Sequence, residues 1–323
     1  MAIDENTIRS LLIRNKISRY KLEQIKSDAS FREYYRVLDK NLLIMYAPKD
    51  RGESLVNFER INKILSSINL SVSNIYDIDY ENNLMLIEDF GNEVFSKILD
   101  NNNEKDFYLK SIQLLSYIHN HSDLEISNIE RYTCDILINE SELFIEWYLE
   151  KHLKLNLSSP EKEEFRNILA KNFKSLSLKH DTLVLRDFHV DNLIYLRKRH
   201  EINQLGLIDY QDALLGSAAY DFISLVEDVR RPIKDELKNF LIETYSKLIF
   251  LDQKELEREI SFYSIQRNLK IIGIFSRLKY RDNKMNYFSM IDVAWSFINY
   301  HLKKPEYNDL NDWIDTIMKR YHD

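Results

Sequence analysis

Three short apolar runs between residues 183 and 210 constrain the fold of this chain more than any other feature. They are Leu183–Leu185, Leu193–Leu196 and Leu205–Ile208. A charged turn at residues 197–201 separates the second run from the third, which is the pattern of a β-hairpin. Asp187 and Asn192 lie between the first run and the second, and Asp209 directly follows the third. The sequence therefore predicts a polar loop between two strands and a further acidic residue at a strand end.

This order is typical of a kinase catalytic loop that is followed by a metal-binding strand. Phosphoryl transfer requires a carboxylate that orients an incoming hydroxyl and accepts its proton, and Asp187 suits that role. It also requires hard oxygen ligands for Mg²⁺, which Asn192 and Asp209 provide. On the alternative interpretation all three are ordinary turn residues, because Asp and Asn are common in turns and their spacing alone is a weak signal.

The first ninety residues read as mixed strand and helix, and the remainder as mainly helical. Four segments rich in aromatic and branched residues are predicted strands: Phe31–Leu38, Asn41–Met45, Ile75–Tyr80 and Asn83–Ile87. Apolar residues recur at helical spacing between residues 56 and 68. The segment 88–91 breaks the pattern. We therefore expect an α+β chain of two lobes, a small β-rich N-terminal lobe at 1–90 and a helical C-terminal lobe at 91–323, with a hinge at 88–91.

Composition excludes several classes of protein. The formal charge of −7 disfavours a general nucleic-acid binder, which needs a basic surface for the phosphate backbone. No apolar stretch approaches the roughly 20 residues that cross a bilayer, and the N-terminus has no signal-peptide pattern. Cys134 is the single cysteine, which fits a reducing compartment. We expect a cytoplasmic protein without a membrane or nucleic-acid partner; its oligomeric state stays open.

The sequence resembles the aminoglycoside phosphotransferase/choline kinase superfamily, and within it the bacterial N-acetylmuramate/N-acetylglucosamine 1-kinases. The matching segments are spread over almost the whole chain: 28–37, 45–48, 86–91, 142–148, 208–221 and 266–282. The resemblance implies a bilobal protein-kinase-like fold. It also implies an enzyme that uses ATP and Mg²⁺ to phosphorylate a hydroxyl of a small molecule, here the anomeric hydroxyl of an amino sugar in cell-wall recycling.

The resemblance assigns roles that agree with the chemical interpretation. Asp187 is the catalytic base, and Asn192 and Asp209 are the Mg²⁺ ligands. The main-chain groups of a hinge segment receive the adenine, and a turn covers the phosphates. These two segments consist of Glu88, Asp89 and Phe90, and of Ser27, Asp28, Ala29 and Ser30.

Two further residues are expected to support the catalytic loop. His189 lies within the loop, and we favour a packed, hydrogen-bonded histidine over direct catalysis. Asp221 follows the hairpin and has two interpretations that stay open: a buried acid beneath the loop, or the N-cap of a helix.

Three departures from the superfamily pattern affect the predicted site. Leu185 stands where these kinases usually place a histidine, and the phosphate turn contains no glycine. The strand 41–45 has no lysine to pair with the phosphates. Three nearby cations are candidates to replace it, although each is typical of a solvated surface charge: Lys49, Arg32 and Arg36. Glu53 and Glu59 are candidates for the helix carboxylate that pairs with such a cation.

The acceptor is expected to bind in the helical lobe. Gln211 and Asp212 follow the metal-binding Asp209 closely and are candidates for sugar contacts. Arg267 and Arg281 are candidates for an acidic substituent, since a guanidinium pairs bidentately with a carboxylate. On the alternative interpretation the arginines of this region form internal ion pairs.

Other functions remain open at this stage. A kinase of another acceptor (an aminoglycoside, choline or homoserine) keeps the same chemistry. A non-catalytic, ATP-binding pseudokinase is suggested by the missing strand lysine and by Leu185, but the chain retains all three polar core residues. A protein kinase is disfavoured, because Tyr210 and Gln211 follow Asp209 where protein kinases have Phe-Gly.

Overall fold

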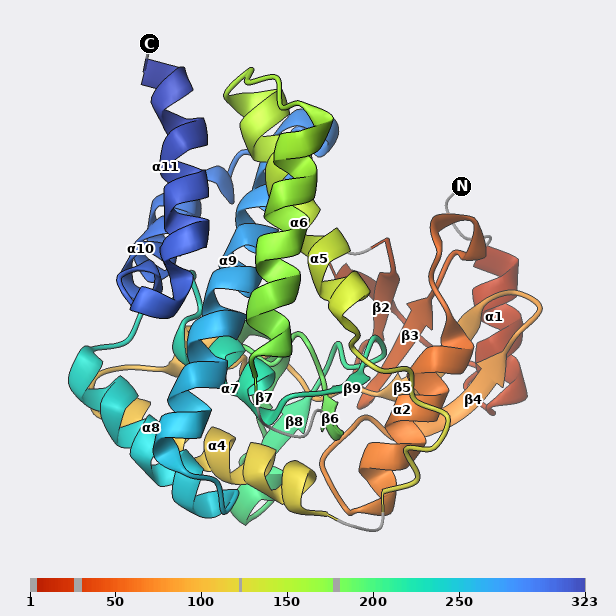
Figure 1. Ribbon diagram of the computed structural model, residues 1–323. Coiled ribbons are helices and arrows are strands. Elements are labelled where there is room, and N and C mark those ends of the chain that lie inside the picture. The colour runs from red at the N-terminus through yellow and green to blue at the C-terminus, as the bar shows by residue number, and fades with distance from the viewer. Residues whose placement is uncertain (1–4, 26–30, 122–123, 177–180, 323) are drawn as a thin grey trace. The chain divides into compact units, whose positions relative to one another are not determined.

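The computed structural model describes residues 5–25, 31–121, 124–176 and 181–322 (Figure 1). The chain divides into two compact units. The N-terminal unit comprises Met1–Leu114, His121–Ile126 and Val190–Ala213, and the helical unit comprises Leu115–Asn120, Ser127–His189 and Leu214–Asp323. The boundary between lobes that the sequence places at residues 88–91 stays a prediction.

A five-stranded antiparallel sheet forms the centre of the N-terminal unit. The strands, in the order β1-β2-β3-β5-β4, are Leu22–Ile25, Glu33–Val37, Leu42–Tyr46, Leu84–Glu88 and Ile75–Asp79. The four predicted strands are therefore confirmed to within a few residues. The first strand was not predicted, because its sequence LEQI carries two exposed polar residues at its centre.

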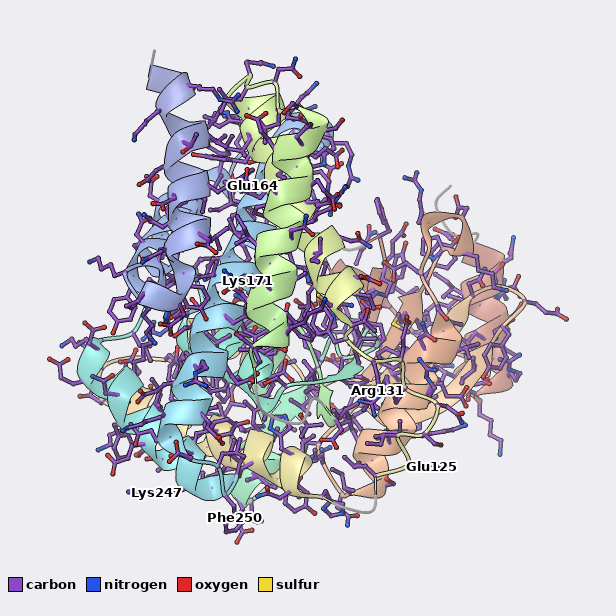
Figure 2. All side chains as sticks on the ribbon, in the orientation of Figure 1. Glu125, Arg131, Glu164, Lys171, Lys247 and Phe250 are labelled. Carbon is purple, nitrogen blue, oxygen red and sulfur yellow. The ribbon has the colours of Figure 1, made fainter. Side chains whose placement is uncertain are left out.

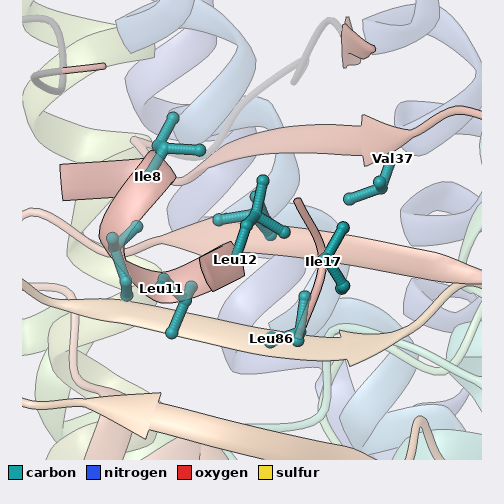
Figure 3. Packing of buried hydrophobic residues seen from close by; sticks show 8 residues of the cluster. Ile8, Leu11, Leu12, Ile17, Val37 and Leu86 are labelled. Atoms are coloured by element: carbon teal, nitrogen blue, oxygen red, sulfur yellow. The ribbon is translucent and has the colours of Figure 1, made fainter. Parts of the chain in front are cut away.

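One face of this sheet is covered by the N-terminal helix α1, Glu5–Arg14 (Figure 3). Ile8, Leu11 and Leu12 are at most 3% exposed and pack against Val37 and Leu86 of the sheet. These helical residues follow the i, i+3, i+4 spacing that places side chains on one face of a helix. The helix α2, Leu55–Ser67, begins at the N-cap Ser54, whose side chain accepts a hydrogen bond from the Asn57 amide at 3.2 Å.

A second antiparallel pair completes the part of the N-terminal unit that concerns function. Strands β7 (Leu193–Tyr195) and β8 (Leu205–Leu207) form the hairpin that the sequence predicts. The short helix α3, Phe95–Ile98, packs against β7, and Val94 bridges to Ile194.

The helical unit is built around the long helix α9, which contacts α5, α7, α8, α10 and the π-helix η2 (Figure 1). Its elements are α5 Cys134–Leu143, η2 Phe144–His152, α6 Ser159–Lys174, α7 Ala218–Val226, α8 Asp235–Leu248, α9 Gln253–Asp282, α10 Ile291–Leu302 and α11 Asn308–His322. The strands β6 (Thr182–Val184) and β9 (Leu214–Gly216) pair antiparallel. The predicted α+β class, with a small sheet and a mainly helical remainder, is confirmed.

Close helix packing requires a glycine at the centre of α9. A Cβ atom on Gly273 would lie 2.3 Å from the carbonyl carbon of Leu143, where α5 passes into the π-helix.

The aromatic residues of the π-helix η2 belong to the core, since Tyr148 stacks on Phe144 and accepts a hydrogen bond from Trp295 at 3.2 Å. Figure 2 labels Lys171 on α6. Its ammonium pairs with Asp309 of α11 at 2.5 Å, and both side chains are exposed.

No helix in the described part of the chain is long and apolar enough to span a membrane.

The end of helix α4, Glu104–Asn120, carries a histidine that contacts helix α8. The Nδ1 atom of His119 lies 2.6 Å from the hydroxyl oxygen of Tyr245 on α8. Burial lowers the pKa of His119 to about 4, while a backbone hydrogen bond at Leu183 opposes the shift. The His119 imidazole therefore becomes protonated near pH 6.5 in the unfolded chain, but only near pH 4 in the folded chain.

This difference predicts an acid-sensitive contribution to stability. Because the pKa is lower in the folded state, the contribution of His119 is complete above pH 6.5 and is lost as the pH falls toward 4. We expect His119→Asn to reduce the pH dependence of the free energy of unfolding over this interval, by up to about 3 kcal/mol. Urea unfolding at several pH values measures it. Parallel curves for the two proteins would contradict the prediction.

Candidate active site

The β7–β8 hairpin brings two of the predicted site residues to the same end. Leu193 pairs with Leu207, so Asn192 directly precedes the first strand and Asp209 closely follows the second. The Ile208 amide donates to the carbonyl oxygen of Asn192 at 3.2 Å. Asp209 has a positive φ of 60°, which is uncommon for a residue with a side chain. Asn192 and Asp209 therefore lie at the same end of the hairpin.

Arg32 lies beside Asp209, and the expectation that it is a surface charge is wrong. Its guanidinium is 7% exposed; Nη2 contacts Oδ1 of Asp209 at 2.7 Å and Nε contacts Oε2 of Glu53 at 2.9 Å. Burial opposes the charge of Arg32, but Asp209, Glu53 and Tyr34 together hold its pKa above the ordinary value. A buried cation therefore bridges Glu53, two residues before α2, and Asp209, two residues after β8.

The turn after Asp209 is fixed by side-chain contacts of its own. Gln211 accepts a hydrogen bond from Nη1 of Arg32 at 2.7 Å and donates to Asp209 and Asp212, both at 3.1 Å. The hydroxyl of Tyr210 accepts from Nδ2 of Asn62 at 2.7 Å. Gln211, which the sequence suggests for the acceptor, thus has its amide committed to this network. Its contact with an acceptor stays a prediction.

The donor set at the hairpin end fits a magnesium ion that is shared with a nucleotide. Asn192 and Asp209 offer hard oxygen atoms, which Mg²⁺ prefers. The side chain of Asp209 is 37% exposed, and both contacts described above fall on its Oδ1 atom. Among the described residues there is no group of three or more His, Cys, Asp and Glu side chains that could hold a metal alone. Such a site would draw its remaining ligands from phosphate and water.

Two of the three main-chain amides in the predicted hinge already donate hydrogen bonds within the protein. The Glu88 amide donates to the Asn74 carbonyl at 2.8 Å, and the Asp89 amide donates to the Asn41 carbonyl at 3.0 Å. Within the described ranges, no acceptor is seen for the amide of Phe90. Of the three predicted positions, Phe90 is therefore the one with an amide available to a base.

Side-chain packing holds this hinge in place. The ring of Phe90 lies against Gly206 of β8, where an added Cβ would come within 2.7 Å of it, and Arg199 lies over the ring at 5.2 Å. The guanidinium of Arg36 binds the carboxylate of Asp89, and this hydrogen bonding raises the pKa of Arg36. Arg36 is 15% exposed, so the surface-charge expectation is wrong for it as well.

The other candidates for the missing lysine and its partner lie elsewhere. Lys49 is exposed and donates to the Tyr80 carbonyl at 3.0 Å, as expected of a surface charge. Glu59 pairs with Lys63 at 2.5 Å and accepts a hydrogen bond from Tyr80. Glu53 is thus the candidate carboxylate that meets a buried cation. The predicted phosphate turn, residues 27–30, lies outside the described residues.

In the helical unit, Asp221 binds the backbone that leads to Asp187. Its carboxylate accepts hydrogen bonds from the amides of Leu185 at 2.5 Å and Arg186 at 2.9 Å. Ser217 is the N-cap of α7, so the N-cap interpretation of Asp221 is wrong. Asp221 is 0% exposed, and burial raises its pKa to about 7; Asp187 adds to the rise, while the two amides and Arg267 oppose it. Arg186 has a φ of 72°, a strained backbone that these hydrogen bonds hold.

A group of charged residues that the sequence analysis missed surrounds Arg186. Glu140 of α5 accepts hydrogen bonds from Arg186, from Tyr132 and from Lys270 of α9, the last at 2.8 Å. Arg186 also lies over the ring of Tyr132 at 5.3 Å. Arg186 and Lys270 lie 46 and 130 residues from Glu140 in the sequence, so no local pattern could have joined them to it.

The remaining predicted residues lie apart from one another. Arg267 is 5% exposed and close enough to Asp221 to lower its pKa. Arg281 is the penultimate residue of α9 and pairs with Asp282, its last residue, at 2.8 Å. Fourteen helical residues separate the two arginines, which is about 20 Å along the axis, so they do not share a site. His189 is buried at 6% exposure, as expected of a packed loop histidine.

Known proteins share this organisation. Residues 21–258 match the model of the phosphotransferase enzyme family. The chain is 27% identical over 305 residues to an N-acetylmuramate/N-acetylglucosamine kinase of Pseudomonas putida, with 91% of this chain and 87% of that protein aligned. It is 28% identical over 288 residues to the protein of the same name in Neisseria meningitidis, with 85% and 82% aligned.

Solved structures show the same fold at low sequence identity. The choline kinase LicA of Streptococcus pneumoniae matches with a TM-score of 0.65 at 15% identity, over 92% of this chain and 99% of that one. The aminoglycoside phosphotransferase APH(2'')-Ib matches with a TM-score of 0.63 at 16% identity, over the same shares. The predictions of a kinase-like fold and of a small-molecule kinase are confirmed, and the chain belongs to the phosphotransferase enzyme family.

Proposed function

We propose that this phosphotransferase uses ATP and Mg²⁺ to phosphorylate the anomeric hydroxyl of an amino sugar, N-acetylmuramate or N-acetylglucosamine. The observation that carries the proposal is the similarity, over 78–91% of the chain, to four curated proteins that all bear the name N-acetylmuramate/N-acetylglucosamine kinase. An adenine nucleotide as the donor is supported by structural neighbours that were solved with ADP and with AMP.

In the proposed reaction Asp187 accepts the proton of the sugar hydroxyl while the hydroxyl oxygen attacks the terminal phosphorus of ATP. The bond from that phosphorus to the bridging oxygen breaks, and ADP leaves. A bound Mg²⁺ would neutralise charge on the phosphates, with Asn192 and Asp209 as its protein ligands. Asp221 would act through the backbone, because its hydrogen bonds to Leu185 and Arg186 hold the chain directly before Asp187.

Arg32 is our candidate for the cation that replaces the usual strand lysine. Its ion pair with Glu53 joins a cation to a carboxylate, as the lysine–glutamate pair of protein kinases does. A guanidinium has five donors, and the contacts of Arg32 to Glu53 and Asp209 place its positive charge beside the proposed Mg²⁺ ligand.

The charges near Asp187 favour a neutral or acidic acceptor over a cationic one. Arg186 and Lys270 both interact electrostatically with Asp187. A choline or aminoglycoside acceptor would bring a further positive charge to these two cations, which is unfavourable in a partly buried site. This argues against the cationic alternatives.

Replacement of Asp187 tests the proposed chemistry. We expect Asp187→Asn to lower kcat with N-acetylglucosamine at least about a hundredfold while ATP affinity stays within a factor of about three, because the change removes a proton acceptor and no nucleotide contact. Asp209→Ala serves as the comparison and should weaken Mg·ATP binding as well. ADP release and fluorescence titration measure the two effects.

Two outcomes would contradict the proposal in different ways. Near-normal turnover by Asp187→Asn would remove this residue from the role of base. A wild-type protein that binds Mg·ATP yet releases no ADP with either amino sugar would favour another acceptor or a pseudokinase.

Replacement of Arg32 tests its proposed role. Arg32→Met leaves Glu53 and Asp209 without their shared cation, and we expect the free energy of unfolding to fall by about 3 kcal/mol. ATP affinity should fall at least about tenfold. Arg51→Met is the control, since Arg51 is 56% exposed in the same unit and should change stability by less than about 0.5 kcal/mol. Equal effects of the two changes, or unchanged ATP binding by Arg32→Met, would refute the assignment.

A further inference from the structure

One carboxylate in the helical unit serves two cations. Glu140 binds Arg186 and Lys270 with the same oxygen, Oε1, and its other oxygen accepts a hydrogen bond from the hydroxyl of Tyr132. Its pKa is lowered: burial opposes ionisation, but Lys270 and then Arg186 overcome that effect. The hydrogen-bonded group of Glu140, Arg186 and Lys270 therefore carries a net charge of +1.

Lys270 is the member of this group with donors to spare. Its ammonium has three N–H donors, and the structure gives one contact for it, to Glu140 at 2.8 Å. Its side chain is 16% exposed, so it is neither sealed in the core nor free in solvent. Burial opposes its charge, yet Tyr220, Glu140 and Asp187 hold its pKa above the ordinary value. Lys270 thus stays charged within electrostatic range of the proposed base.

We propose that Lys270 binds an anionic substituent of the acceptor and that Glu140 holds Lys270 in place for it. This inference rests on the proposed function, because it assigns the part of the acceptor site that distinguishes an acidic sugar from a neutral one. A carboxylate on the acceptor balances the surplus charge of the group. With a neutral acceptor, Lys270 has no new anion to bind and its ion pair with Glu140 stays intact.

The other cations of the helical unit suit this role less well. Arg186 uses its guanidinium on Glu140 and on the ring of Tyr132. Arg267 is more deeply buried and lies near Asp221, beneath the backbone of the loop. Arg281 pairs with Asp282 and lies eleven helical residues from Lys270, about 16 Å along α9. Among these four cations, Lys270 is the one that both interacts with Asp187 and has N–H donors left for an anion on the acceptor.

The test compares two acceptors that differ by one carboxylate-bearing group. N-acetylmuramate carries a lactyl ether where N-acetylglucosamine carries a hydroxyl. We expect Lys270→Gln to lower kcat/KM for N-acetylmuramate at least about tenfold more than for N-acetylglucosamine, chiefly through KM, since a charge-assisted hydrogen bond is lost. Lys279→Gln is the matched control on the same helix and should leave the ratio of the two kcat/KM values unchanged.

A second variant keeps Lys270 and changes the ratio in the opposite direction. Glu140→Gln removes the competing negative charge while an amide still meets Lys270, Arg186 and Tyr132. It should therefore raise the preference for N-acetylmuramate relative to N-acetylglucosamine, by about threefold or more. The temperature of unfolding identifies a variant that fails to fold, and the other variant then decides.

The outcomes separate this inference from the proposed function. Wild-type turnover of N-acetylglucosamine together with the two opposite shifts in the ratio supports both. Equal losses for the two acceptors in Lys270→Gln would overturn the inference and assign Lys270 to the positioning of Asp187, leaving the sugar kinase intact. Wild-type turnover of N-acetylglucosamine but not of N-acetylmuramate would overturn the inference alone. Turnover of neither would overturn both.

Discussion

The hydrogen bonds from two backbone amides to the buried carboxylate of Asp221 are the interaction on which the backbone before Asp187 depends. An acid at 0% exposure is costly unless its oxygens are bonded, and the amides of Leu185 and Arg186 bond them. In return the carboxylate holds Arg186 at a positive φ, which sets the direction of the chain into Asp187. The same contact explains why an apolar Leu185 can stand where these kinases usually have a histidine. The Asp221 carboxylate already binds the Leu185 amide, so no side-chain hydrogen bond is needed to hold the backbone.

A buried ion pair has the corresponding position in the N-terminal unit. The three charged residues of this pair lie before strand β2, before helix α2 and after the hairpin: Arg32, Glu53 and Asp209. Because they are largely removed from water, each charge is stabilised by its opposite partner. Because Gln211 bonds both Arg32 and Asp209, the turn after the hairpin is part of the same network. If Arg32 has the proposed role, strand β3 needs no lysine.

Sequence patterns predicted the parts of the fold that depend on local order. The β7–β8 hairpin was visible because its strands are short apolar runs joined by a charged turn. Strand β1 was not, because its pairing with β2 and not its composition makes it a strand. Arg32 was mistaken for a surface charge, since its partner Asp209 lies 177 residues away. Glu140 and Lys270, 130 residues apart, were missed for the same reason.

The charge balance around Asp187 bears on the proposal that one site accepts both a neutral and an acidic sugar. A fixed cation with no carboxylate beside it would favour an acid and penalise a neutral sugar, because the neutral sugar would leave a buried charge unpaired. Glu140 removes this penalty by pairing Lys270 when no anion is present. Glu140 also pairs with Arg186, so its carboxylate would keep a cationic partner if Lys270 turned to an acceptor. Tolerance of both substrates would then follow from a cation with an internal partner, without any change of backbone.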